Sequence, residues 1–357
     1  MHATTIAIAI DIAKSVFQLH WIAPETGQIH RRKLSRPKLM EFITRRAASR
    51  VVMEACGGAH HLARQFTAMG HAVELLPAGQ VRAFVRGNKD DAADARGIWL
   101  AAQQSDIRRV PLKTVEQQGV QALHRLRSHW MTTRNASLNC LRGLLYEFGL
   151  VLPKGPVAAR KQLAAQREPL ERLVPAPLAR SVQLQLDMIG QCEQTIAALE
   201  GELKAVLKQS KSARRLDAVP GIGLLGATAL AATIGDGKAW RNSRQFACSI
   251  GLPPGHSGSG GKVQMGRMTK RGDPYLRTLL IAGARSLILL PKKSPWLQAL
   301  LDRRPVNVAV VALAHKLARM AWALVAHQRE YDPRWQSQPP QPPQPLRAQA
   351  AQAAQVA

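Results

Sequence analysis

The sequence predicts an α/β domain at the N-terminus, followed by two long helices and a mostly helical C-terminal region. Three observations predict this order. Short β-branched runs alternate with helical segments early in the chain, two long stretches carry apolar residues at helical spacing, and a Gly- and Ala-rich segment follows them. We therefore expect four segments, at residues 1–108, 109–213, 214–330 and 331–357.

The first segment begins with three expected strands. Residues 5–10 alternate β-branched side chains with Ala and end at Asp11. Residues 16–21 form a second strand, and Gly27 occupies the turn before a third strand at residues 28–34. Strands joined in this way predict an antiparallel hairpin at the start of the sheet.

Strands and helices then alternate up to about residue 108. We expect a short strand at residues 50–53 that ends at Glu54, a helix at 60–69, a strand at 72–76 and a helix at 91–104. This alternation completes an α/β domain.

The second segment contains two long amphipathic stretches, residues 114–146 and 178–207, separated by the Pro-containing residues 153–177. Such a pattern predicts an antiparallel helical arm or an oligomerising coiled coil. Three arginines on the first stretch either contact a phosphate backbone or belong to a solvated face: Arg125, Arg127 and Arg134.

The composition indicates a polyanionic partner. The chain has 50 Lys and Arg against 23 Asp and Glu, a formal net charge of +27. Nucleic acid is the default partner for so large an excess, and a ribosome-associated protein, a merely basic protein or a protein of anionic membranes are the alternatives.

We expect a soluble intracellular protein. The sequence has no secretory signal and no run of about 18 uncharged apolar residues that would span a membrane. The tail at residues 331–357 is rich in Pro, Gln and Ala, which predicts disorder. Four widely spaced cysteines favour reduced thiols over disulfides or a zinc finger: Cys56, Cys140, Cys192 and Cys248.

Four acidic residues form the strongest candidate site. Asp11 and Glu54 follow expected strands, and Asp91 and Asp94 lie three residues apart on one face of an expected helix. Four clustered carboxylates repel one another unless a divalent cation lies among them, and Mg²⁺ prefers such hard oxygen ligands. Each acid taken alone is as well explained as a helix cap or a solvated side chain. The combination indicates a ribonuclease-H-like nuclease fold.

Two features of the C-terminal region suit phosphate binding. Residues 219–223 (Val-Pro-Gly-Ile-Gly) precede a small-residue helix and resemble a helix-hairpin-helix turn, in which Gly221 and Gly223 would let backbone N–H groups approach a phosphate. An ordinary helix–helix turn is the alternative.

The second feature is a Gly/Ser segment at residues 251–262, which we expect to be a loop. Its glycines and its dense cationic flank suit a phosphodiester, and a hydroxyl there could attack phosphorus. A flexible surface loop is the alternative. The flanking cations are Lys262, Arg267, Lys270, Arg271 and Arg277.

Three blocks of the N-terminal segment resemble those of a known enzyme family. Residues 9–14 (Ala-Ile-Asp-Ile-Ala-Lys), 53–57 (Met-Glu-Ala-Cys-Gly) and 88–95 (Asn-Lys-Asp-Asp-Ala-Ala-Asp-Ala) look like the blocks of the DEDD transposases of the IS110 insertion-sequence family, closest to its IS1111 branch. That resemblance implies an N-terminal domain like the RuvC Holliday-junction resolvase. Asp90 stands where the family usually has Thr, so Asp91 and Asp94 match the metal-binding pair.

The C-terminal segment resembles the same family. Counting back from Gly266 in its Ser-Gly-x5-Gly pattern places the family's nucleophilic serine on Ser259, with Ser257 as the second candidate because the loop is rearranged. The resemblance extends from about Ile6 to Ala326. It implies a serine recombinase that forms a phosphoserine intermediate.

The resemblance also implies partners and a location. These are donor and target DNA, a noncoding bridge RNA that selects both, Mg²⁺, and a homo-tetramer built as a dimer of dimers, with no membrane partner. The location would be the bacterial cytoplasm at the nucleoid. Two alternatives stay open: a metal-dependent, structure-specific DNA nuclease without serine chemistry, and a nonenzymatic nucleic-acid scaffold.

Overall fold

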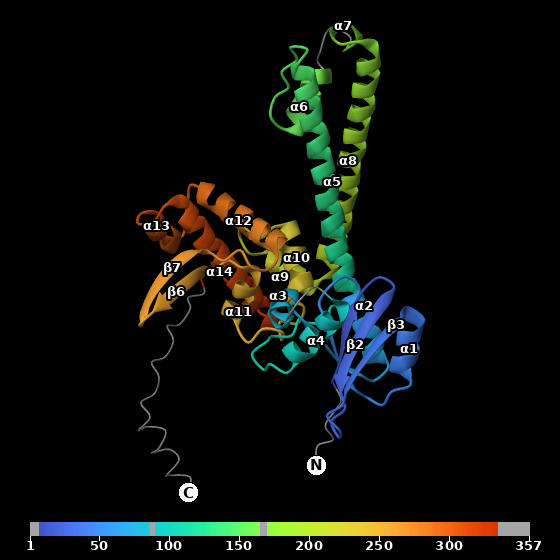
Figure 1. The fold of residues 1–357 in the computed structure, drawn as a ribbon. Helices are drawn as coiled ribbons and strands as arrows, with labels where there is room; N and C mark the ends of the chain where they lie inside the picture. The colour runs from blue at the N-terminus through green and yellow to red at the C-terminus, as the bar shows by residue number, and fades with distance from the viewer. Residues whose placement is uncertain (1–6, 86–89, 165–169, 335–357) are drawn as a thin grey trace.

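The computed structural model describes residues 7–85, 90–164 and 170–334 (Figure 1). Five strands form the N-terminal sheet in the order β3-β2-β1-β4-β5. β1–β2 and β2–β3 pair antiparallel, whereas β1–β4 and β4–β5 pair parallel. This mixed sheet is compatible with a ribonuclease-H-like fold. The strands are β1 (Ala7–Ile12), β2 (Val16–Ile22), β3 (Ile29–Ser35), β4 (Arg50–Glu54) and β5 (Ala72–Leu76).

The strand predictions agree with the structure to within one residue at each end, except that the first strand ends two residues later than predicted. β1 runs past Asp11 to Ile12, because Asp11 pairs with Gln18 in the β1–β2 ladder. Residues 5 and 6 of the predicted strand lie outside the described residues. The short helix α1 (Arg36–Thr44) was not predicted.

Helices cover both faces of the sheet, because alternate side chains of a strand point to opposite faces. Ile8 and Ile10 of β1 pack in one core with α1 and with α2 (Ala59–Ala68). Ala9 lies in a second core with Ile98 of α4 (Asp91–Ala102). α4 therefore lies across the face opposite α1 and α2. The helix α3 (Ala78–Val81) and a 3-10 turn at Arg82–Phe84 precede it.

Two long helices, α5 (Val115–Tyr146) and α8 (Ala176–Gln209), form an antiparallel arm (Figure 1). A capping box at Thr114 and Gln117 begins α5, and Arg127 of α5 forms an ion pair of 2.7 Å with Glu200 of α8. The predicted long helices are thus confirmed. Arg127 is engaged within the arm and is not a free phosphate ligand. At the end of the arm lie α6 (Pro156–Ala164) and α7 (Leu170–Leu173).

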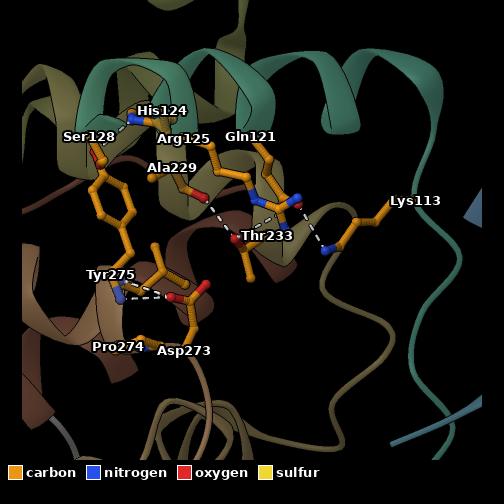
Figure 2. A pocket seen from close by; sticks show the side chains of 11 residues that line it. Lys113, Gln121, His124, Arg125, Ser128, Ala229, Thr233, Asp273, Pro274 and Tyr275 are labelled. Carbon is orange, nitrogen blue, oxygen red and sulfur yellow. Dashed lines mark hydrogen bonds between the residues drawn. The ribbon is translucent and has the colours of Figure 1, made fainter. Parts of the chain in front are cut away.

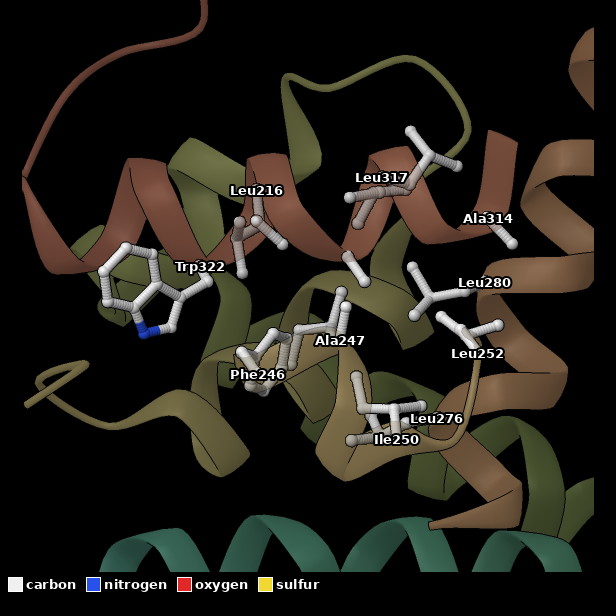
Figure 3. Packing of buried hydrophobic residues seen from close by; sticks show 14 of the residues in the cluster. Leu216, Phe246, Ala247, Ile250, Leu252, Leu276, Leu280, Ala314, Leu317 and Trp322 are labelled. Carbon is white, nitrogen blue, oxygen red and sulfur yellow. The ribbon is translucent and has the colours of Figure 1, made fainter. Parts of the chain in front are cut away.

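The C-terminal region is mostly helical and has one core (Figure 3). Phe246 of α11 and Leu280 of α12 meet Leu317 and Trp322 of α14 there. The elements are α9 (Lys211–Asp217), α10 (Leu224–Ile234), α11 (Ser243–Ile250), β6 (Pro254–Ser259), β7 (Lys262–Met268), α12 (Pro274–Leu289), α13 (Pro295–Leu301) and α14 (Val306–Ala326).

The predicted Gly/Ser loop is instead a β-hairpin. β6 and β7 pair antiparallel around Gly260 and Gly261, whose φ angles are +58° and +78°. Two consecutive residues with positive φ are what a type I′ hairpin turn requires. The loop prediction was wrong because Gly and Ser are poor strand formers, whereas the Gly-Gly turn sets the pairing.

One helix, α14, is long and apolar enough to cross a membrane by length and mean hydropathy. Half of the relevant stretch is buried within the protein, and its residues Ala314, Leu317 and Trp322 belong to the C-terminal core. The helix also carries Lys316 and Arg319, so no uncharged run of that length exists there. Packing within the fold accounts for its apolar character.

A close helix contact predicts a large stability effect at Gly283 of α12. A Cβ atom there would lie 1.8 Å from the carbonyl oxygen of Gly221. We expect Gly283→Ala to lower the free energy of unfolding by about 2–3 kcal/mol, because the turn and α12 must separate. Gly201→Ala in α8 is the control: its Cβ meets nothing within 4 Å, and Ala should stabilise the helix by about 0.5–1 kcal/mol. Thermal unfolding of both variants measures this, and equal midpoints would contradict the contact.

Candidate active site

The structure brings three of the predicted acids together. Asp11 lies near the end of β1, and Asp91 and Asp94 lie in the first turn of α4, which packs across that strand. One carboxylate oxygen of each lies within 4.8 Å of the others. Asp11 thus meets two side chains that follow it by 80 and 83 positions in the sequence, because α4 crosses the end of β1.

Glu54 is close to this group but outside its tightest part. It ends β4, the parallel neighbour of β1, with Met53 opposite Ile10. The negative charge of Glu54 raises the pKa of Asp11, and the charge of Asp94 raises the pKa of Glu54. The arrangement therefore places Asp11 within electrostatic range of the other three predicted acids.

Burial and mutual repulsion disfavour ionisation of these carboxyl groups. Burial, then the charges of Asp94, Asp91 and Glu54, raise the pKa of Asp11 to about 6. Burial and Asp94 likewise raise the pKa of Glu54. Partly desolvated oxygen donors that repel one another are the donor set that a hard divalent cation fits, because the cation offsets their charge.

Asp90 has a structural role that distinguishes it from its neighbours. It is the N-cap of α4, and its side chain accepts a hydrogen bond of 3.2 Å from the backbone N–H of Ala92. Asp91 and Asp94 follow in the first turn, where the helix dipole favours negative charge. The cap supports Asp91 and Asp94, rather than Asp90, as the metal-binding pair.

Sequence reasoning missed a clamp at the other end of α4. Glu74 of β5 accepts hydrogen bonds from Arg50 and Arg109 at 2.6–2.9 Å, and both arginines also donate to the carbonyl oxygen of Ala102. Ala102 ends the helix that carries Asp91 and Asp94, so the clamp fixes that helix to the sheet. The only sequence signal was a charged residue in each of two mostly apolar strands, Arg50 in β4 and Glu74 in β5.

Ser259 ends β6 and is exposed, opposite Lys262 in the hairpin. Ser257 is two residues earlier, so both hydroxyls lie on one face of the strand. In Figure 1 the hairpin lies on the opposite side of the molecule from the sheet that carries Asp11. One chain by itself does not bring the predicted serine to the acids.

The predicted cations surround this hairpin unevenly. Lys262 and Arg267 lie exposed on β7, and Lys270 and Arg271 are exposed just after it. Arg277 is half-buried and donates a hydrogen bond of 2.7 Å to the carbonyl oxygen of Ile250. Within residues 7–85, 90–164 and 170–334, none of the five forms an ion pair with a carboxylate. Four of them are therefore available to a polyanion.

The predicted glycine turn joins α9 to α10. Gly221 has φ +86° and packs against α12, where a Cβ would lie 3.1 Å from the carbonyl oxygen of Gly283. Helix packing thus explains Gly221. Gly223 is exposed at the N-cap of α10, so of the two it is the one placed to present a backbone N–H to an anion.

The raised pKa of Asp11 predicts a pH-dependent gain in stability for Asp11→Asn without metal. The native group binds its proton more tightly than the unfolded one, so the native state loses stability as pH rises from about 4 to about 6. The Asp11→Asn variant has no carboxyl group to ionise at this position, so it does not lose this stability. We expect the variant to melt about 2–4 °C higher than the parent at pH 7.5, a modest value because Asp11 is only half-buried, and the gap should shrink towards pH 4.5. Calorimetry in chelator measures this, and a gap independent of pH would refute the electrostatic cause.

Comparison with known proteins gives two family matches. Residues 8–149 match the IS110 DEDD transposase model, and residues 213–301 match the model described as "Transposase IS116/IS110/IS902 family". A protein of Pseudomonas aeruginosa named "Probable family 20 transposase" is 41% identical over 336 residues, covering 91% of this chain and 98% of the relative.

Two further relatives come from named insertion elements. The transposase of IS1111A from Coxiella burnetii is 38% identical over 337 residues, covering 91% of this chain and 90% of the relative. The transposase of IS1328 from Yersinia enterocolitica is 36% identical over 322 residues, covering 89% and 96%. The similarity thus includes the strands and helix of the acids, the arm and the hairpin.

Proposed function

This chain belongs to the IS116/IS110/IS902 family of transposases, enzymes that catalyse DNA strand transfer, and we propose that it cleaves and exchanges strands through a serine nucleophile aided by Mg²⁺. The observation that carries the proposal is the convergence of Asp11, Asp91 and Asp94 within 4.8 Å. The chain is strongly basic and has few acidic residues, yet three of these lie together. Such a group could hold a metal ion that binds the phosphodiester.

We assign the metal to Asp11, Glu54, Asp91 and Asp94. When bound, Mg²⁺ would neutralise charge that builds up on the phosphate during transfer. The chain's own contribution is positional: β1 and β4 hold Asp11 and Glu54, and the clamp at Ala102 fixes α4. Rigid support of this kind is what phosphoryl transfer needs, because positioning and charge supply most of its catalysis.

We assign the nucleophile to Ser259. Its Oγ would form an ester bond to phosphorus while the bond from phosphorus to one deoxyribose oxygen breaks; a base takes the serine proton and passes it to the departing oxygen, which leaves as a hydroxyl. Attack by the hydroxyl of a second strand on the phosphoserine then reseals the DNA and releases Ser259. The exposed cations Lys262, Arg267, Lys270 and Arg271 would hold the strand beside it.

The separation of Ser259 from the acids within one chain supports an assembled site. We propose that the acids of one subunit meet the serine of another in a tetramer arranged as a dimer of dimers. The long arm favours this, since apolar Leu126 and Leu184 on its two helices are 49% and 71% exposed. Both would be covered if arms paired as coiled coils.

We further propose that a noncoding bridge RNA selects donor and target DNA. Base pairing would then read the sequence, and the protein would need only to bind backbones, which suits a net charge of +27 with few aromatic residues. The proposed units are a RuvC-like domain at 1–108, an arm at 109–213 and a serine domain at 214–330, acting in the bacterial cytoplasm at the nucleoid. Most of the predicted disordered tail, residues 335–357, lies outside the described residues.

Expression of the chain with the noncoding DNA that flanks its element tests this function. We expect one structured RNA from that flank to copurify, and strand exchange between donor and target DNA to require both that RNA and a divalent metal. Strand exchange that persists after RNase treatment would contradict the proposal that an RNA selects the DNA. Cleavage without joining would favour the junction-nuclease alternative.

A further inference from the structure

A cavity of about 540 Å³ lies between the arm and the C-terminal core, and neither the four proposed metal ligands nor the residues of the β6–β7 hairpin line it (Figure 2). α5, α10 and the start of α12 form its walls, which are segments far apart in the sequence. Its size falls within the range of small-molecule sites, large enough for one nucleotide. Neither the metal site nor the hairpin accounts for it.

Two cations form one side of the cavity. Lys113 is more than half-buried, and its Nζ donates a hydrogen bond of 2.8 Å to Gln121, which leaves further N–H groups of the ammonium unused. Arg125 is exposed, and among the described residues no carboxylate lies within ion-pair distance of it. A phosphate would give Arg125 a counter-charge and would add to the charge of Asp273 that already acts on Lys113.

The ring of Tyr275 stands on another side, and its hydroxyl is fixed by a buried histidine. The single hydroxyl proton of Thr228 goes to the carbonyl oxygen of Leu224 at 2.7 Å, so Thr228 accepts from Nε2 of His124 at 3.0 Å. Nδ1 of His124 is then free to accept from the Tyr275 hydroxyl at 2.9 Å. An aromatic ring held in this way is a preformed surface on which a base can stack.

A carboxylate lies next to the backbone of Tyr275 (Figure 2). Oδ1 of Asp273 accepts from the backbone N–H groups of Tyr275 and Leu276, as the N-cap of α12. Oδ2 has no hydrogen-bond partner among the described residues. A free carboxylate oxygen accepts from an exocyclic amino group, such as N4 of cytosine, and repels the carbonyl O4 of uracil or thymine.

We propose that this cavity binds one unstacked nucleotide with an amino-bearing base, the phosphate on Lys113 and Arg125, the base against Tyr275 and its amino group on Asp273. The proposal rests on the proposed function only in that a nucleic acid strand is bound to the protein. Extruding a base costs free energy, least in a strand that is already unpaired, so the site would hold a bulged or single-stranded residue. DNA and RNA share this chemistry.

Equilibrium dialysis of the full chain against CMP, UMP, dCMP and dTMP at low salt tests the site. We expect one saturable site per chain, with CMP or dCMP binding about tenfold tighter than UMP or dTMP. Asp273→Asn retains a capping side chain but adds an amide donor, so it should bring the two affinities within about threefold. The ribose and deoxyribose arms show which strand the site takes.

Arg125→Ala should weaken every nucleotide about fivefold or more, whereas Arg134→Ala, on the same helix but outside the cavity, should change binding less than twofold. Equal loss in both variants, or inorganic phosphate competing as well as CMP, would overturn the proposal, as would no saturable binding up to about 10 mM. Ser259→Ala should bind CMP like the parent. Loss of strand exchange in that variant with no CMP site in the parent would sink this inference and leave the proposed function intact.

Discussion

Ser259→Ala is expected to abolish strand cleavage and exchange, with a loss of at least about 10³-fold. The reason is that the variant has no oxygen to form the ester to phosphorus, and removal of a nucleophile costs far more than removal of a contact. Gel assays of cleaved and joined DNA measure this, and samples run with and without protease digestion reveal covalent adducts. The parent should show a DNA–protein adduct and the variant none.

Ser257→Ala is the matched control, since it lies two residues away on the same exposed strand face. We expect it to retain adduct formation within a few-fold. The reverse outcome, with Ser257 essential and Ser259 dispensable, would assign the role of nucleophile to Ser257. Full cleavage by both variants would mean that water attacks phosphorus, and the chain would then act as a metal-dependent nuclease.

Much of the site could be predicted because its residues have local signals. Asp11 and Glu54 each follow a β-branched run, and a parallel pairing of those two runs brings their ends to one edge of the sheet. Asp91 and Asp94 are neighbours on one helix face. The long helices were equally clear, because apolar spacing over many turns and a capping sequence at Thr114 agree.

The features that could not be predicted depend on contacts between residues that are far apart in the sequence. Nothing near Arg50 or Arg109 in the sequence indicates that both meet Glu74 and the end of α4. The Gly/Ser hairpin was missed because residue propensities favour a loop, and the packing of Gly221 against Gly283 could not be predicted because the two residues are more than 60 positions apart. Tertiary contacts decide such features, and one sequence carries no record of them.

A second expected result distinguishes the proposed metal ligands from Asp90, the neighbouring acid that caps α4. Asp94→Asn should lower strand cleavage about 10³-fold, because a neutral amide is a weaker ligand for Mg²⁺ and several kcal/mol of charge stabilisation are lost. Metal should also raise the melting temperature of the parent but not of this variant, since a ligand stabilises only the fold that binds it. Cleavage assays and melting curves with and without Mg²⁺ measure both effects.

Asp90→Asn is the control that distinguishes catalysis from helix capping. Asn accepts the hydrogen bond from Ala92 as well as Asp does, so α4 should begin at the same residue and activity should stay within a few-fold of the parent. If Asp90→Asn abolished cleavage while Asp91→Asn left it intact, the metal-binding pair would begin one residue earlier. Such a result would be hard to reconcile with the cap geometry, because a side chain turned to the Ala92 N–H cannot also face Asp11. The paired variants therefore test the register of the metal site and the fold of the helix that supports it.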